Sequence, residues 1–295
     1  MSFNIFEVCE RFKEEEAAIR FLQEKGALHQ HRTCTRGHAM KYCQRTGRHG
    51  PRWRCQKGGG GEEVPVRRGT WFDGEKLELK KALVLIYSWS RGYTRMSFCS
   101  RELGISSNCA VAMQKRLREV AAESLLRDPL VIGGPGLTVE VDETAFSKRK
   151  YQRGRMYPTQ WVLGGVCRET GECFLVPVGN RSSQTLLPLI RQYVRPGTTV
   201  ITDEWRGYRG LAGSGYTHLT VNHSLQFVQP ETGAHTQTVE SLWAQVKRSN
   251  KLRCGTPRRF LDSYLCEFMW RRRLRPRQDP FDCIVNDIAT YWPPQ

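Results

Sequence analysis

The sequence predicts a mixed α/β domain that follows two small basic modules. Beyond residue 136, short apolar runs alternate with stretches of helical periodicity, the pattern of a sheet covered by helices. The run Gly133-Gly134-Pro135-Gly136 separates this half from a first half rich in cysteine, histidine and helical periodicity. Eight tryptophans and 39% hydrophobic residues supply the apolar side chains that a folded core needs.

The chain carries a large excess of positive charge. Its 46 Lys and Arg against 29 Asp and Glu give 46 − 29 = +17 over 295 residues. Such a charge predicts a polyanionic partner, most commonly nucleic acid, and the alternative is a basic but otherwise ordinary enzyme. We expect no membrane partner, because no apolar run approaches the length of a spanning helix. Eleven cysteines without a secretion signal indicate a reducing compartment.

Residues 1–30 predict an N-terminal packing helix. Phe6, Cys9 and Phe12 recur at intervals of three, Lys and Glu fill the gaps, and Gly26 is a suitable stop.

Residues 31–72 have the look of a zinc ribbon. Its candidate ligands are Cys34, His38, Cys43 and Cys55. A ribbon needs two close pairs to converge on one ion, and only Cys34 with His38 forms such a pair. The alternative is a ribbon that has lost its ion.

Residues 73–132 predict a helix-turn-helix. A short helix ends near Leu103, Gly104-Ile105-Ser106 makes the turn, and Ser106 or Ser107 caps the second helix. The inner face of that second helix would consist of Ala110, Met113, Leu117 and Val120. Its outer face would present Asn108, Lys115, Arg116 and Arg118 to DNA. The alternative is a helical hairpin with a solvated basic face.

Residues 133–295 alternate strand and helix. Expected strands cover 137–141, 161–167, 172–178, 199–202 and 218–221, and expected helices cover 183–194, 205–211 and 238–251.

Three acids in this half stand at the ends of expected elements. Asp142 and Asp203 each close an apolar strand, and Glu240 lies at the start of a helix. Carboxylates at the ends of adjacent strands converge at one edge of a sheet, and a crossing helix can add a third. Such a cluster repels itself unless cations neutralise it, and hard oxygen ligands suit Mg²⁺ or Mn²⁺. Two such ions can serve the cleavage of a phosphodiester. Strand-end acids are also common as simple caps.

Other side chains could assist this edge. Lys247 is seven residues beyond Glu240, two helical turns along one face, and could hold a phosphate there. His223 and His235 lie just outside the edge and could assist proton transfer, position DNA or serve the structure alone.

The runs VEVDET, TDEWRGY, VNHS, HTQTVESLWAQVKR and YLCEFMWRRR, in this order, resemble the Merlin superfamily of cut-and-paste DDE transposases and its bacterial insertion-sequence relatives. The resemblance extends over residues 33–291. It implies an RNase H-like catalytic core with Asp142, Asp203 and Glu240 as ligands of two metal ions, cleavage at transposon ends, and attack of the freed 3′-hydroxyl on target DNA. Family members usually carry a zinc ribbon with two Cys-x-x-Cys-like pairs. Here Gly37 and the run Gly58–Gly61 replace two expected ligands, so at most one weakly held zinc ion is expected.

The stretch 247–277 is strongly basic. It holds eleven Lys and Arg against Asp262 and Glu267, a local balance of 11 − 2 = +9. A solvated charge run is the usual reading of such a stretch, but beside a catalytic helix we prefer a DNA-backbone track. The expected phosphate contacts are Lys247, Arg248, Arg271, Arg272 and Arg273.

The resulting hypothesis is a DNA transposase that acts on double-stranded DNA, both transposon terminal inverted repeats and target. Pairing two ends would require at least a homodimer. Its compartment would be the nucleus in a eukaryote, or the cytoplasm and nucleoid in a bacterium. The alternatives are a domesticated, transposase-derived DNA-binding protein without transposition activity and another RNase H-like nuclease such as a junction resolvase.

Overall fold

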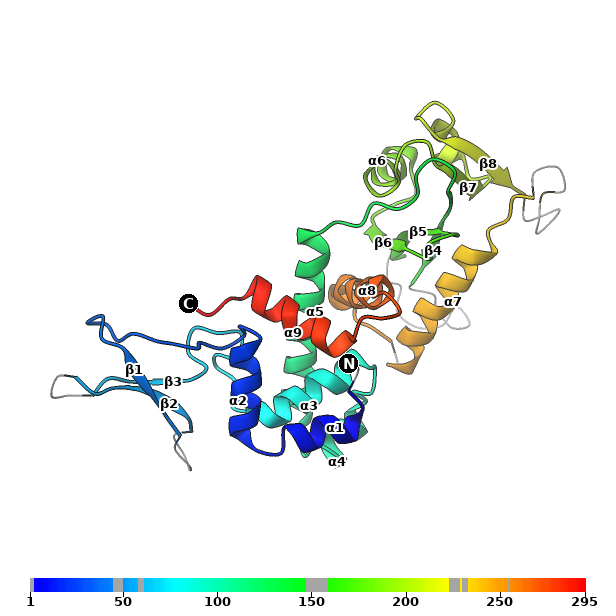
Figure 1. The fold of residues 1–295 in the computed structure, drawn as a ribbon. Coiled ribbons are helices and arrows are strands. Elements are labelled where there is room, and N and C mark those ends of the chain that lie inside the picture. The colour runs from blue at the N-terminus through cyan, green and yellow to red at the C-terminus, as the bar shows by residue number, and fades with distance from the viewer. Residues whose placement is uncertain are drawn as a thin grey trace. The chain divides into compact units, whose positions relative to one another are not determined.

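The computed structural model describes residues 3–44, 50–57, 61–146, 159–222, 229, 233–253 and 255–295. The chain divides into two compact units (Figure 1). The first comprises Met1–Ser124 and Arg275–Gln295, and the second comprises Leu125–Leu274. No helix in the described ranges is long and apolar enough to cross a membrane.

The first unit combines helices with a small antiparallel sheet. Its helices are α1 (Ile5–Arg11), α2 (Glu15–Glu24), α3 (Leu79–Ser90), α4 (Met96–Arg101), most of α5 (Ser107–Arg127) and α9 (Pro280–Tyr291). Its sheet has the order β1 (Met40–Cys43), β2 (Arg52–Cys55), β3 (Glu63–Pro65).

The expected N-terminal helix is two helices. Phe12 ends α1 and is only 2% exposed, since its ring packs on Phe21 at 5.0 Å and on Phe281 at 6.3 Å between ring centroids. Burying this ring turns the chain before α2 begins, so the prediction of one continuous helix is wrong.

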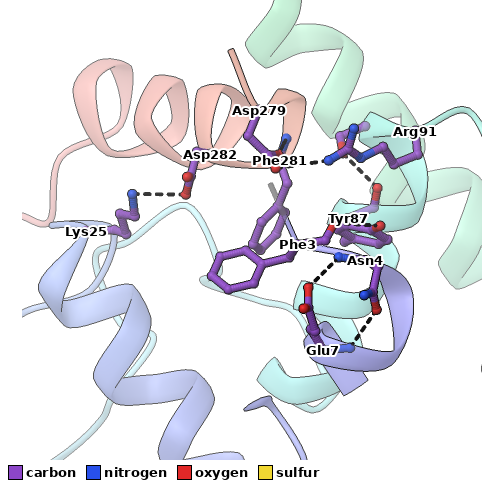
Figure 2. A network of polar contacts seen from close by, with 10 residues as sticks. Phe3, Asn4, Glu7, Lys25, Tyr87, Arg91, Asp279, Phe281 and Asp282 are labelled. Carbon is purple, nitrogen blue, oxygen red and sulfur yellow. Dashed lines mark hydrogen bonds and ion pairs between the residues drawn. The ribbon is translucent and has the colours of Figure 1, made fainter. Parts of the chain in front are cut away.

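Helix α9 belongs to the first unit, although we expected residues 133–295 to form one domain. Figure 2 shows its polar attachment. The Asp279 carboxylate accepts a hydrogen bond from the backbone N of Phe281 and pairs with Arg91 at 2.9 Å, while Asp282 pairs with Lys25 at 3.0 Å. The fully buried Phe281 stacks on Phe21 at 5.8 Å. The apolar face and the ion pairs of α9 therefore hold the C-terminal helix against the helices of the first unit.

The expected linker at residues 133–136 is not the boundary between the units, which falls inside α5. Gly133 and Gly134 are buried in the second unit, where the backbone N of Gly134 donates to Thr198 Oγ1 at 2.8 Å. At Gly133, with φ of 78°, a Cβ would lie 2.6 Å from the same oxygen, so only glycine fits this position.

The second unit is built on a mixed five-stranded sheet. The strands are β4 (Thr138–Ala145), β5 (Trp161–Cys167), β6 (Cys173–Val178), β7 (Thr199–Asp203) and β8 (Thr217–Val221). In the order β6-β5-β4-β7-β8, the β6–β5 and β5–β4 pairs are antiparallel, and the β4–β7 and β7–β8 pairs are parallel. This arrangement fits an RNase H-like catalytic domain, as expected.

Helices cover both faces of this sheet. Buried residues of α6 (Ser183–Tyr193) and the 3-10 helix η2 (Arg206–Leu211) share one apolar core with the sheet. Those of α7 (Gln237–Leu252) and α8 (Arg258–Arg273) share another. Alternation along β4 assigns Val139 and Val141 to the α6 side, and Glu140, Asp142 and Thr144 to the α7 side.

Candidate functional site

Asp142 and Asp203 lie at matching positions on neighbouring parallel strands. The register of β4 and β7 pairs Thr138 with Thr199 and Glu140 with Ile201. Two residues further along, the same register reaches Asp142 on β4 and Asp203, the last residue of β7. Because side chains alternate along a strand, both carboxylates project from the same face of the sheet at one edge. The two acids converge as predicted from the sequence, but Asp142 does not close its strand, because β4 continues to Ala145.

The Asp142 carboxylate is held by α7. The indole Nε1 of Trp243 donates a hydrogen bond of 2.9 Å to Asp142 Oδ2. Burial and the neighbouring charge of Glu143 raise the pKa of Asp142 to about 7, with a further contribution from Asp203, while the Trp243 bond acts in the opposite direction. A further negative charge near this carboxylate is therefore unfavourable, whereas a positive charge there is favourable.

Asp203 shapes the turn that follows β7. Its Oδ1 accepts a hydrogen bond of 3.0 Å from the backbone N of Trp205, and the Trp205 indole donates to the backbone O of Arg181 at 2.8 Å. These bonds fix the chain between the strand end and η2.

A fourth acid, Glu143, lies beside Asp142 but faces the opposite side of the sheet. The hydroxyl of Tyr208 and Arg181 Nη1 (3.0 Å) both donate to its carboxylate, which is almost fully buried. The Arg181 guanidinium lies 4.2 Å from the ring centroids of both Trp161 and Trp205. Burial raises the pKa of Glu143, and the bonds from Tyr208 and Arg181 oppose that rise. This cluster was not predicted from the sequence, although Glu143 stands in VEVDET, and Trp205 and Tyr208 in TDEWRGY.

Glu240 is exposed in the first turn of α7. The three predicted metal ligands do not form a group whose ligand atoms all lie within 4.8 Å of one another. The structure thus brings Asp142 and Asp203 to one edge, with α7 docked beside them, and Glu240 is exposed in the first turn of that helix without joining the two aspartates in one compact group. Mutual repulsion of carboxylates favours this separation.

The predicted auxiliary residues have different surroundings. His235 Nδ1 lies 3.4 Å from Glu140 Oε1, so this ring faces the buried part of β4. His223 lies outside the described residues. Lys247 Nζ donates to Thr144 Oγ1 at 2.5 Å, two residues along β4 from Asp142, and Arg248 is exposed.

The predicted metal module keeps three of its four ligands together. Among the described residues, Cys34, His38 and Cys55 form one group whose ligand atoms all lie within 4.8 Å of one another. Burial opposes a low pKa of the Cys34 thiol, but backbone hydrogen bonds at Arg36 and His38 lower this pKa. A lowered pKa favours the thiolate, the form that binds zinc. The group supports a Cys-His-Cys site.

Cys43 does not join this group. The β1–β2 register pairs Met40 with Cys55 and Cys43 with Arg52, so Cys43 stands three pairs from Cys55 along the ladder, roughly 10 Å away. Its Sγ donates instead to the backbone O of Lys41 at 3.7 Å.

Helices α4 and α5 lie where the helix-turn-helix was predicted. Ser106 Oγ accepts a bond of 3.3 Å from the backbone N of Cys109, as a cap does. Asn108 and Lys115 are exposed, and Lys115 pairs with Glu119 at 3.6 Å. Arg118, which we predicted on the outer face, is only 5% exposed, since it lies one helical turn before the fully buried Ala121. It is therefore unsuited to contact DNA.

The three arginines at the end of α8 are half-buried and already engaged, contrary to their predicted role in a DNA track. Arg271 pairs with Glu267 at 2.8 Å, and Arg272 Nε donates to the backbone O of Gly171 at 2.8 Å. Arg273 forms an ion pair with Asp128. The first contact lies within α8, and the other two tie this helix to other segments of the second unit.

Known proteins resemble parts of the chain. Residues 133–273 match the ISXO2-like transposase domain. An uncharacterized transposase-like protein of Haemophilus influenzae is 36% identical over 98 residues, which cover 33% of this chain and 78% of that relative. The HTLV-2 integrase catalytic core domain, solved in complex with magnesium, aligns over 46% of this chain and 84% of its own with 15% identity and a TM-score of 0.30.

Proposed function

The chain belongs to a transposase family, and we propose that it binds transposon ends, cleaves phosphodiester bonds there and joins the 3′ ends to target DNA. The observation that carries the proposal is the β4–β7 register, which brings Asp142 and Asp203 to one sheet edge beside α7. The order of motifs along residues 139–273 supports a further assignment to the Merlin superfamily.

The residues at this edge fit a divalent metal. Asp142 is largely buried next to two other carboxylates, and its pKa of about 7 reflects how poorly its negative charge is compensated by the protein alone. Carboxylate oxygens are the ligands that Mg²⁺ and Mn²⁺ prefer. We assign Asp142, Asp203 and Glu240 as the residues that would hold two such ions. When bound, these ions would activate the attacking oxygen and stabilise the leaving one.

The other side chains would position these groups and the DNA. Trp243 orients the Asp142 carboxylate, and Lys247 places a positive charge beyond the end of the site, where a phosphate could lie. The exposed Asn108 and Lys115 on α5 would contact the transposon end, and the exposed Arg248 would contact the phosphate backbone of the DNA. Acting on two ends at once would require two copies of the chain.

The separation of Glu240 from Asp142 and Asp203 favours a second candidate, a transposase-derived protein that binds DNA without cleaving it. The two candidates differ in strand cleavage, which a single experiment measures.

The experiment incubates the full chain with transposon-end DNA and Mg²⁺ and compares Asp142→Ala, Asp203→Ala and Glu240→Ala with the wild type. Each variant should lose cleavage and keep end binding. The matched control is Glu204→Ala, which removes an exposed acid next to Asp203 and should cleave normally. Cleavage retained by any of the three site variants would refute that ligand's assignment. A wild-type chain that binds ends without cutting them would establish the second candidate.

A further inference from the structure

We propose that Glu140 is a positioning residue that fixes the start of α7, and with it the direction in which Glu240 points. The inference rests on the proposed function only for the role of Glu240. Glu140 lies on β4 two residues before Asp142, its side chain is fully buried, and it is not among the proposed metal ligands.

The Glu140 carboxylate joins three separate segments. Its Oε1 pairs with Arg168 Nε at 2.6 Å and lies 3.4 Å from His235 Nδ1. Its Oε2 accepts a bond of 2.9 Å from the backbone N of Val239. Arg168 in turn donates through Nη2 to the backbone O of His235 at 2.7 Å. The glutamate and the arginine therefore hold the chain on both sides of the first residue of α7.

The bond to Val239 is a helix cap supplied by a neighbouring strand. Val239 is in the first turn of α7, whose backbone N–H groups have no partner within the helix. A carboxylate there satisfies one such group and interacts favourably with the positive end of the helix dipole. A charge-assisted bond is also directional, so it sets the rotation of the helix as well as its position.

Two further bonds continue this contact along α7. Asp142 accepts from Trp243, and Thr144 accepts from Lys247 at 2.5 Å. The strand partners are two residues apart, about 6.6 Å, and the helix partners are four residues apart, about 6 Å, so the two spacings match.

These three hydrogen bonds between β4 and α7 set the direction of the Glu240 side chain. Glu240 lies one turn before Trp243 on the same face of α7, so a slip of the helix by one residue would turn its side chain by about 100° relative to β4. Of the three hydrogen bonds between β4 and α7, the one from Val239 to Glu140 lies closest in sequence to Glu240.

A purely stabilising role is a poor explanation for this residue. Apolar side chains of similar volume often stabilise a buried position as well as an ion pair does, whereas an ion pair adds fixed geometry. The surrounding core supplies apolar neighbours, because Val239 and Leu242 of α7 are both fully or almost fully buried.

The test removes the charge of the Glu140 side chain and keeps its size. Glu140→Gln in the full chain should increase amide hydrogen exchange in residues 237–243 by about tenfold relative to the rest of the second unit. Mn²⁺ should raise the melting temperature, and the Mn²⁺ concentration that gives half of this rise is the Mn²⁺ midpoint. Glu140→Gln should increase this midpoint by about tenfold, the usual effect of removing a residue that orients a metal ligand. Binding to end DNA should remain.

The matched control is Leu186→Ala. This fully buried residue of α6 lies in the core on the other face of the sheet, so its loss lowers stability without touching α7. It should leave both the exchange of residues 237–243 and the Mn²⁺ midpoint unchanged. If Glu140→Gln does not fold, Arg168→Lys can replace it, because lysine cannot donate to Glu140 and to the backbone O of His235 with the geometry of a guanidinium. It should shift the hydrogen exchange and the Mn²⁺ midpoint in the same direction.

Unchanged exchange and an unchanged Mn²⁺ midpoint in Glu140→Gln would overturn the inference. The outcome is separable from that of the proposed function. If Glu240→Ala still cleaves DNA, the assignment of Glu240 fails, while faster exchange in Glu140→Gln would still establish the cap on α7. If Glu240→Ala is inactive and Glu140→Gln behaves like Leu186→Ala, only the positioning role fails.

Discussion

Replacing Asp142 with Asn should make the metal-free protein more stable at alkaline pH. Burial and the adjacent Glu143 raise the pKa of Asp142 from its ordinary value of 3.8 to about 7. The folded state then binds more protons than the unfolded state between these two values, so the free energy of unfolding decreases as pH rises through this window. Asparagine keeps the shape of the side chain and carries no charge to desolvate.

The size of the effect follows from the shift in pKa. A difference of about 3 units corresponds to a ceiling of about 4 kcal/mol, at about 1.36 kcal/mol per unit. The carboxylate keeps some contact with solvent, which reduces this to about 2–4 kcal/mol. For a unit of this size, the gain corresponds to an increase in melting temperature of roughly 5–10 °C.

The assay is thermal unfolding in a chelator across a pH series. At about pH 8 Asp142→Asn should melt above the wild type, and at about pH 4 the difference should vanish, because both side chains are then neutral. Adding Mg²⁺ at the higher pH should stabilise the wild type and leave the variant unchanged. Glu204→Gln, which neutralises an exposed neighbouring acid, should follow the wild type throughout. A gain in Asp142→Asn that does not depend on pH would refute the reasoning.

Metal analysis of the purified chain should find at most one zinc ion, which Cys34→Ser removes and Cys43→Ser leaves in place; loss in both variants would return Cys43 to the ligand set. Asn108→Ala should weaken binding to end DNA more than to random duplex, measured by fluorescence anisotropy, and equal losses would limit this helix to backbone contacts. Arg273→Glu should lower the melting temperature and leave the dependence of log affinity on log salt unchanged, because Asp128 already holds the guanidinium. A slope shallower by about one would make Arg273 a phosphate contact.

Most elements of the second unit could be predicted from local patterns, although α8 was not among the expected helices. The expected strand 161–167 coincides with β5, and α6 and β7 each differ from their expected ranges by one residue. Apolar alternation and helical spacing are properties of neighbouring residues, so the sequence displays them directly. The strand-end position of Asp203 follows from the same patterns, whereas β4 continues past Asp142 to Ala145, and the parallel register aligns the two acids.

Features that depend on distant partners could not be predicted in this way. The break at Phe12 depends on Phe281, and the exclusion of Cys43 from the metal group depends on the β1–β2 register. The burial of Arg118 depends on how wide a face of α5 the rest of the unit covers. In each case the local sequence is compatible with either outcome, and a contact made far along the chain decides between them.

The placement of charge on β4 explains why its central acid is so sensitive to its surroundings. Glu140 and Glu143 project from opposite faces of the strand, and each is neutralised by an arginine, Arg168 and Arg181 respectively. Asp142, between them, is bonded to an indole, which donates a hydrogen bond but carries no positive charge. Of these three acids, Asp142 is thus the one whose described bonds leave its charge without a cationic partner, at the edge that Asp203 also reaches. A divalent cation would complete the charge balance at this position, whereas at the two flanking glutamates it would compete with a guanidinium already in place.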